Sequence, residues 1–365
     1  MTRSRIRLSR GPGWFAGACL LVTLGLLAGC AAPAPGGAPA PSRAPSAPTA
    51  RPPSTAPPAA APTPAATAAA PLPMKLGYSV RTGSQAIAQV LLDSGTLAAN
   101  GLDATVLYVE GPARMVPALL TGDVDVAFLG GEPTLSAAAE GAELAVIGGL
   151  VNRREHVVFA APRLQTVADL RGQRLAINGI NSADHNALLD ALQHFGIDPQ
   201  DVAFLVVGGG QPNRLAAIQA GAADATALQP PVTALARAEG LRELLQVGSV
   251  VERPVPTTAV VTSKSALAGR TEVLARFMQA LRQGIRLYHE QPAVASAGIA
   301  AFFGLDLAEH GAEVEDTRAH YAGLYPDPPA PPVEGYRQML ADLAAANPRL
   351  SGFHVEDVID ERFVR

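Results

Sequence analysis

The chain has 365 residues, of which 28 are Lys or Arg and 32 are Asp or Glu, for a formal net charge of −4. No basic surplus or basic stripe is present, which argues against a nucleic-acid partner. The only cysteines are Cys19 and Cys30, so the sequence predicts no disulfide framework. The length allows a large buried core and more than one folded lobe.

The first segment has the residue order of an export signal. Four arginines within residues 1–10 precede an uncharged apolar run from Trp14 to Ala28 that ends in small residues. A run of about 15 residues is shorter than the roughly 20 that a membrane-spanning helix needs, although an uncleaved anchor is the alternative. We therefore predict a lipoprotein signal peptide over residues 1–29.

Leu27-Ala-Gly-Cys30 resembles the lipobox of bacterial lipoproteins. The resemblance implies cleavage before Cys30 and acylation of its sulfur, so Cys30 is the predicted lipidation site. Cys19 would leave with the signal, and the mature chain would hold no disulfide. We expect an extracytoplasmic protein, attached by lipid to the membrane in the periplasm or on the outer face of the cell.

Residues 30–73 are predicted to be a disordered tether. From Ala31 to Pro73 the sequence is almost entirely Ala, Pro, Ser, Thr and Gly, without periodicity and with too few large apolar side chains for a core. Proline-rich chain extends about 3.1 Å per residue, so the tether could reach roughly 130 Å from its anchor. We expect it to act only as a spacer.

The globular part begins with alternating strand and helix patterns. Met74–Val80 is a predicted strand, Ser84–Ala99 a helix and Ala104–Val109 a second strand, which together form a βαβ unit. Thr121–Phe128 is a predicted third strand that follows a helix over Arg114–Leu120.

After this strand, Gly130–Thr134 opens another helix, with Pro133 near its first position, and Ala142–Leu150 is a predicted fourth strand.

An internal repeat in the sequence predicts the architecture. Residues of the first unit recur 99 positions later, which is hard to obtain by chance for Gly, Asp and Glu-Gly: Gly111 and Gly210, Gly122 and Gly221, Asp125 and Asp224, Glu140-Gly141 and Glu239-Gly240, and Leu76 and Leu175. We read two copies of one α/β lobe, with a cleft between them.

The second lobe has its own set of predicted strands. After the segment Val157–Ala160, the predicted strands of this lobe lie at Arg174–Ile177, Val202–Val207, Ala222–Leu228 and Leu241–Val247. Thr258–Thr262 is a predicted strand without a counterpart in the second copy, so we interpret it as the return crossing into the first lobe.

The remainder is predicted to be helical cover for the first lobe. Glu272–Tyr288 carries an apolar stripe formed by Val273, Leu274, Phe277, Leu281, Ile285 and Tyr288, and a helix over Gly335–Ala346 follows the Pro326–Pro332 loop. The predicted domains are therefore a discontinuous lobe 1 at residues 74–155 and 258–365, and lobe 2 at residues 156–257.

Motifs spread over the chain after the tether resemble one family. The matching pieces are Leu76-Gly-Tyr78, Asn100-Gly-Leu-Asp103, Ala118–Ala127, Asp169–Arg174, Gly196-Ile-Asp-Pro199, Ala220–Asp224 and Asp357–Phe363. They resemble the solute-binding lipoproteins of ABC importers in the nitrate, sulfonate, taurine and thiamine-pyrimidine-precursor class. The resemblance implies an α/β, two-lobe, type II periplasmic-binding-protein-like fold, with lobes joined by two hinge crossings and a ligand cleft between them.

Ligands of open α/β sheets bind beyond the carboxyl ends of strands, so we expect the site in the loops after the first and third strands of each lobe. Those loops begin at Arg81, Gly130, Asn178 and Gln229, and each leads into a helix N-terminus. Ordinary helix capping is the alternative for Ser84 and Ser182. The candidate ligand-binding residues are Arg81, Thr82, Gly83, Ser84, Gly130, Gly131, Glu132, Asn178, Asn181, Ser182, Asp184 and Gln229.

Two of these candidates are carboxylates, which argues against a simple anion site. Glu132 and Asp184 would repel a sulfonate or phosphate unless a cation such as Arg81, Arg153 or Arg154 neutralised them. A nitrogen heterocycle or zwitterion with hydrogen-bond donors fits equally well. The solute is thus expected to be a small polar or anionic molecule, such as a sulfonate, nitrate, a pyrimidine precursor or a related heterocycle.

Signals for catalysis are missing from the sequence. The seven histidines lack the i, i+4 spacing of a helical metal pair, and Gly208-Gly-Gly210 lacks the ending of a phosphate loop. No Gly-x-Ser-x-Gly elbow is present. We predict a non-enzymatic, monomeric binding protein without cofactor or metal, whose partners are a small solute and an ABC permease. The alternatives are an enzyme of thiamine-pyrimidine synthesis on the same fold, or a ligand-sensing receptor domain.

Overall fold

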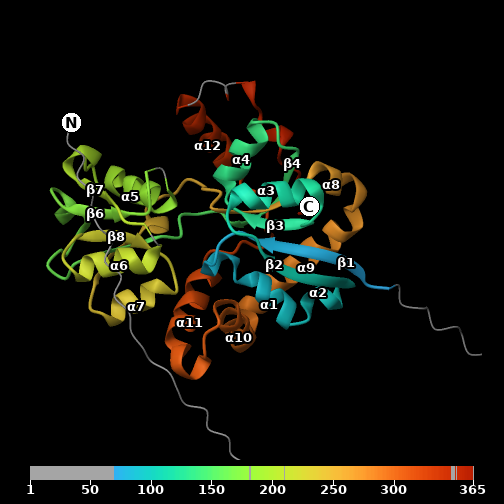
Figure 1. The fold of residues 1–365 in the computed structure, drawn as a ribbon, viewed down its shortest axis with the longest axis horizontal. Helices are drawn as coiled ribbons and strands as arrows, with labels where there is room; N and C mark the ends of the chain where they lie inside the picture. Colours follow the sequence, from blue (N-terminus) through green and yellow to red (C-terminus); the bar gives the residue numbers. More distant parts are fainter. Residues whose placement is uncertain (1–69, 181, 209, 347–349, 351, 365) are drawn as a thin grey trace, which may run out of the picture. The chain divides into compact units, whose positions relative to one another are not determined.

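The computed structural model describes residues 70–180, 182–208, 210–346, 350 and 352–364. The predicted signal peptide, Cys30 and nearly all of the predicted tether lie outside this range. Within it, two five-stranded mixed sheets carry the fold, and helices cover both faces of each sheet (Figure 1).

The first sheet has the strand order β2-β1-β3-β10-β4. Strands β1, β2 and β3 are parallel, whereas β10 runs antiparallel between β3 and β4. The strands span Leu72–Tyr78 (β1), Leu102–Tyr108 (β2), Val126–Leu129 (β3), Leu144–Val151 (β4) and Thr258–Ser263 (β10).

The second sheet repeats this arrangement in the order β7-β6-β8-β5-β9. Strands β6, β7 and β8 are parallel, and β5 runs antiparallel between β8 and β9. The strands span Val157–Ala160 (β5), Arg174–Ile177 (β6), Ala203–Val206 (β7), Ala225–Leu228 (β8) and Arg242–Gln246 (β9).

The prediction that the strand at Thr258 has no counterpart is wrong. Strand β5 occupies in the second sheet the place that β10 occupies in the first, antiparallel to the third parallel strand. A search at constant offset misses this pair because β5 opens its lobe whereas β10 follows the whole second lobe. Each sheet is therefore completed by a strand that the chain enters from the other sheet.

The predicted strand Thr121–Phe128 is too long at its start. Helix α3 (Pro112–Thr121) continues to Thr121 and is ended by Gly122, whose φ of 78° lies in the left-handed region that favours glycine. Strand β3 begins only at Val126. The predicted helix Ser84–Ala99 is likewise divided, into a 3₁₀ turn at Gly83–Gln85 and helices α1 (Ile87–Asp93) and α2 (Thr96–Ala99).

The sequence repeat is also a repeat of hydrogen bonds. The Asp125 carboxylate accepts from the Lys75 backbone N–H at 2.7 Å, and Asp224 accepts from the Arg174 N–H at 2.9 Å. Each aspartate thus joins the turn before the third parallel strand of its sheet to the first parallel strand of the same sheet. Arg270 pairs with Asp125. An aspartate occurs at this turn in both halves of the chain. In each half its buried carboxylate accepts from a backbone N–H that would otherwise lack a partner.

The helices bury apolar faces on both sides of the sheets. Helix α9 (Thr271–Glu290) buries the whole predicted stripe from Val273 to Tyr288, and with α1 and α10 (Pro292–Phe303) it covers one face of the first sheet. Helices α3, α4 (Gly131–Ala139) and α12 (Val333–Ala346) cover the other face. The remaining α-helices of the described residues are α5 (Ala183–His194), α6 (Gln211–Gln219), α7 (Val232–Ala238), α8 (Lys264–Gly269) and α11 (Leu307–Ala322).

Among the described helices, none is by itself long and apolar enough to cross a membrane. Helices α10 and α11 meet that test on length and composition only as a pair, and they are bent by 107° relative to each other.

Replacement of the second repeated aspartate tests its contribution to stability. Hydrogen bonds from Arg174 lower the pKa of Asp224 from 3.8 to about 2. A depressed pKa stabilises the fold above the unfolded-state pKa and loses that contribution as the pH falls. We expect Asp224→Asn to lower the free energy of unfolding by about 2 kcal/mol at pH 7, measured by urea denaturation, and by about half as much near pH 3.

The exposed Asp103→Asn serves as the matched control and should change stability little. A loss for Asp224→Asn that does not depend on pH would contradict the ionic role.

Candidate ligand-binding site

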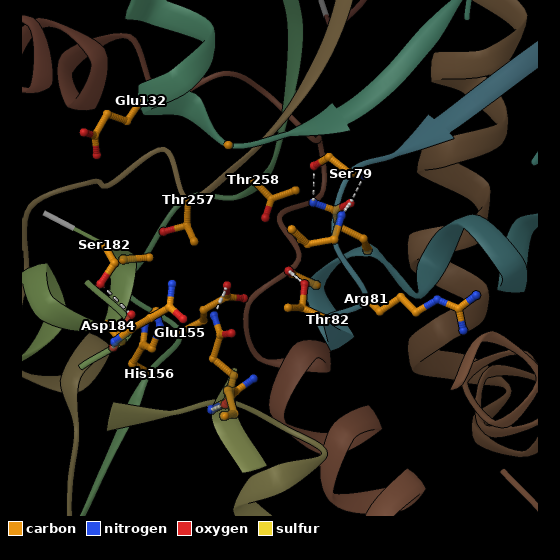
Figure 2. A pocket seen from close by; sticks show the side chains of 18 of the residues that line it. Ser79, Arg81, Thr82, Glu132, Glu155, His156, Ser182, Asp184, Thr257 and Thr258 are labelled. Atoms are coloured by element: carbon orange, nitrogen blue, oxygen red, sulfur yellow. Dashed lines mark hydrogen bonds between the residues drawn. The ribbon is translucent and has the colours of Figure 1, made fainter. Parts of the chain in front are cut away.

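A cavity of about 780 Å³ is lined by the carboxyl ends of strands from both sheets. The four predicted loops all contribute to it. Figure 2 labels side chains from three of them, including Thr82, Glu132 and Ser182. Of the predicted candidates, the structure brings together Arg81, Thr82, Ser84, Gly130, Gly131, Glu132, Asn178, Ser182, Asp184 and Gln229.

Two predicted candidates are not among the lining residues. Gly83 is buried, and a Cβ atom at this position would lie 2.1 Å from the Tyr321 ring, so the glycine is needed for packing. The Gly83 carbonyl accepts from the Tyr325 hydroxyl at 3.1 Å. Asn181 lies outside the described residues.

Sequence reasoning missed the segments that cross between the sheets. Glu155 and His156 enter the cavity from the link between β4 and β5, and Val255–Thr258 enters from the link between β9 and β10. Their only signal in the sequence is their position beside the predicted lobe boundaries. Phe303 and Met339 add apolar lining from helices α10 and α12.

Backbone donors at the start of the first loop are already bonded within the protein. The Gln85 side-chain carbonyl accepts from the N–H groups of Ser79 at 2.8 Å and Val80 at 3.2 Å. The buried Gln85 side chain supplies these two N–H groups with the acceptor that water would supply at the surface.

The other loops follow the same plan. Asp184 accepts from the Asn178 N–H and from the Ser182 hydroxyl, each at 2.7 Å. Gln211 accepts from the Gln229 N–H at 2.5 Å. Asn178 and Asp184 lie 99 residues after Ser79 and Gln85, so the two lobes cap their first loops at equivalent positions. These particular N–H groups are therefore not free to bind an anion.

Two of the arginines that line the cavity, Arg154 and Arg214, are paired with aspartates. The Arg154 Nε donates to Asp190 at 2.6 Å, and Arg214 lies 3.5 Å from Asp184 and donates to the Thr226 hydroxyl. Asp184 is thus neutralised by Arg214. Burial lowers the pKa of Arg214, and the charge of Asp184 opposes this change.

None of the arginines proposed from the sequence neutralises Asp184. The Arg81 guanidinium lies 5.3 Å from the centre of the Tyr108 ring, and Figure 2 shows it extending away from Glu155 and His156. Arg153 is not among the residues that line the cavity. The charge of Arg154 does act on Glu132, whose pKa is raised by burial and lowered in part by Arg154.

Glu155 and His156 form a buried polar centre in the cavity. The Gln229 amide donates to Glu155 Oε1, while Glu155 Oε2 and His156 Nδ1 have no hydrogen-bond partner among the described residues. Burial raises the pKa of Glu155 to about 7, and the hydroxyls of Tyr321 and Ser84 oppose this rise without being placed to donate to Oε2. Burial also lowers the pKa of His156 to about 3, against the opposing charge of Asp184.

The described residues contain no group of three or more His, Cys, Asp or Glu side chains arranged to hold a metal ion.

Comparison with known proteins agrees with this architecture. The model of the family described as NMT1/THI5 like matches residues 92–295, which is more than half of the chain. The chain belongs to the NMT1/THI5-like family. It is 31% identical over 193 residues to a protein of Escherichia coli (strain K12) whose name describes aliphatic sulfonates binding, and the match spans 50% of this chain and 56% of that protein.

Two solved structures show the same fold. The alkanesulfonate-binding protein SsuA from Xanthomonas axonopodis pv. citri, bound to MOPS, superposes with a TM-score of 0.59 at 24% identity, over 80% of this chain and 100% of that chain. The periplasmic aliphatic sulphonate binding protein SsuA from Escherichia coli gives a TM-score of 0.60 at 22% identity, over 77% and 94%. The predicted family and the predicted two-lobe fold class are confirmed.

Substitution of the buried carboxyl tests its electrostatic environment. The Glu155 pKa lies above its ordinary value of 4.5, so the folded state retains this proton more strongly than the unfolded state. Stability contributed by the protonated form is complete near pH 4.5 and is lost as the pH rises through about 7. We expect Glu155→Gln to match the wild type near pH 4 and to exceed it by about 3 kcal/mol at pH 8, measured by urea denaturation.

His156 titrates in the opposite sense, but it is present in both proteins and its effect cancels in the difference. Exposed Glu140→Gln is the control. Equal stability of Glu155→Gln and the wild type at pH 8 would show that the carboxyl is solvated.

Proposed function

We propose that this protein is an extracytoplasmic receptor that captures a small solute and delivers it to an ABC permease, without chemical change. The observation that carries the proposal is the cavity, which is built from loops of both sheets and both crossing segments. Membership of the NMT1/THI5-like family and the name of the Escherichia coli relative support it.

The two sheets define the lobes of the proposed receptor. Lobe 1 would comprise residues 74–155 and 258–365, and lobe 2 residues 156–257, with the boundaries beside Glu155 and Thr258. Two connections of this kind allow rotation of one lobe against the other about a hinge. Closure would enclose a solute that neither lobe can surround alone.

Anchoring is a separate part of the proposal. The signal sequence, the lipobox and the Ala/Pro-rich composition of residues 30–73 support a lipid-anchored receptor on a spacer. Such an anchor would keep the receptor near its permease while leaving it free to sample solute. We expect the receptor to act as a monomer.

The solute is proposed to bind through the candidate residues that line the cavity, from Arg81 and Ser84 in lobe 1 to Asp184 and Gln229 in lobe 2. The names of the relatives point to sulfonates. Nitrate, a pyrimidine precursor and related heterocycles are the other classes that the sequence suggests.

Ligand-induced closure distinguishes a receptor from an enzyme. A ligand that binds only the folded state stabilises it by about 2.7 kcal/mol at a concentration a hundredfold above its Kd, which corresponds to a melting shift of at least roughly 2 °C. We expect one member of a panel of sulfonates, nitrate, pyrimidines and amines to raise the melting temperature and to reduce the radius of gyration in small-angle scattering. The bound molecule should be recovered unmodified.

Recovery of a converted product would favour the enzyme alternative. Tight binding without a change in scattering would reject the hinge. Trp14, the only tryptophan, lies in the predicted signal peptide, so tyrosine fluorescence or an external dye is the suitable optical probe.

Replacement of the predicted lipidation site tests the anchor. Cys30→Ser removes the only sulfur to which the lipid could be attached after cleavage at the lipobox, so the protein should remain uncleaved or be released without acylation. Mass spectrometry of the intact membrane fraction measures both outcomes. Cys19→Ser is the matched control and should leave acylation unchanged. Acylation that persists in Cys30→Ser would refute the assignment.

A further inference from the structure

We propose that the captured solute is an organic cation whose N–H group binds Glu155, with an apolar body that fills the rest of the cavity. This inference rests on the proposed capture function and narrows its substrate class. It differs from the sulfonate binding that the names of the relatives suggest.

The charges of the cavity are not balanced. Arg154 and Arg214 are each paired with an aspartate, and Arg81 extends away over Tyr108. Glu132 and Glu155 both line the cavity, and the charge of Arg154 acts on Glu132. Burial and hydroxyl groups, but no cation, set the pKa of Glu155, so a cationic ligand would supply the charge that Glu155 lacks.

Several donors that an anion would use are missing or occupied at the walls. Helices α3 and α6 begin at the cavity with Pro112 in the first position and Pro212 in the second, and proline has no N–H to offer. The N–H groups of Ser79, Asn178 and Gln229 are occupied by internal acceptors. At these positions an oxyanion would lack the N–H groups by which helix N-termini bind anions.

The Glu155 carboxylate has an oxygen that can accept a hydrogen bond from an N–H group of the ligand. Glu155 is 3% exposed and is one of the residues that line the cavity. Its Oε1 is held by the Gln229 amide, and its buried Oε2 has no hydrogen-bond partner among the described residues. A buried unpaired acceptor costs free energy, and that cost is removed when a ligand donates to it. A ligand that is also cationic stabilises the ionised carboxylate in a place where solvent does not.

The remaining lining accommodates an apolar body. Leu129, Val255, Phe303 and Met339 line the cavity together with Pro112 and Pro212. The volume of about 780 Å³ lies in the range that accepts drug-sized ligands. The solute should therefore carry its charged nitrogen on a ring or a similar apolar group.

The groups that face Glu155 determine how binding depends on pH. His320 of helix α11 contacts the Glu155 carbonyl at 2.9 Å, and burial lowers its pKa. Tyr321 and Tyr325 have pKa values raised well above 10 by burial and stay uncharged. The other groups at the Glu155 side chain are Ser84 and Gln229, while the charges of Arg154, Asp184 and Arg214 act on the adjacent His156. Glu155 is thus the group in this set that changes charge near pH 7.

The test compares two probes that share a benzene ring. Benzamidine carries an amidinium group, and benzenesulfonate carries a sulfonate. Calorimetric titration of the full chain from about pH 6 to about pH 8 should show benzamidine binding that tightens about tenfold over this range, as expected when the ligand requires ionised Glu155. Benzenesulfonate should neither bind nor compete.

Variants connect the effect to the residue. Glu155→Gln should weaken benzamidine binding at least tenfold at pH 8 and abolish its pH dependence, whereas Glu140→Gln on the exposed end of helix α4 should leave both unchanged. Thermal unfolding of Glu155→Gln without ligand checks that the variant is folded.

The opposite results overturn the inference. Binding of benzenesulfonate that tightens as the pH falls would show an anion held by a protonated Glu155, and solute capture would stand without the cation. Failure of benzamidine to bind up to its solubility limit would also reject the cation class, whether or not the sulfonate binds. Solute capture itself is judged separately, by the closure experiment and by native mass spectrometry of a co-purified molecule.

Discussion

The exchange of one antiparallel strand between the two halves of the chain is the constraint on which the rest of the structure depends. Strand β10 completes the first sheet and β5 the second, and each is reached by a crossing from the other sheet. Because both strands begin at the carboxyl ends of their parallel neighbours, the crossing segments must pass through the edge where the loops gather. The topology therefore places Glu155, His156 and Val255–Thr258 in the cavity.

That placement has an electrostatic consequence. A crossing segment enclosed by both sheets and by helix α11 loses solvent, so the Glu155 carboxyl is shifted toward its neutral form and His156 away from its charged form. At the same time the loops satisfy their own N–H groups through Gln85 and Asp184. Glu155 Oε2 and His156 Nδ1 thus stay without a hydrogen-bond partner among the described residues, and in the proposed complex a ligand supplies the donor to Glu155.

Much of this fold follows from local sequence. The repeat at Asp125 and Asp224 correctly predicted two equivalent lobes. It is visible in the sequence because each aspartate bonds a backbone N–H of its own lobe, at the same spacing in the chain. The four loops were predicted because they follow strand patterns directly. The relation of β5 to β10 was missed because it depends on pairing between segments far apart in the chain. Glu155 and the partner of Asp184, Arg214, were missed for the same reason, since tertiary packing brings them to the site.

Helix α11 links the polar centre to any movement of the lobes. Asp316 on this helix accepts from Thr233 at 2.7 Å and from Arg237 at 2.6 Å on helix α7, and His320 contacts the Glu155 backbone. The Arg237–Asp316 pair is partly exposed, so its contribution to stability is about 1 kcal/mol or less. A ligand needs a difference in affinity of only a few kcal/mol between two states to shift their populations. Contacts of this strength would therefore hold one arrangement of the proposed lobes in the absence of solute and still yield on the proposed binding beside Glu155.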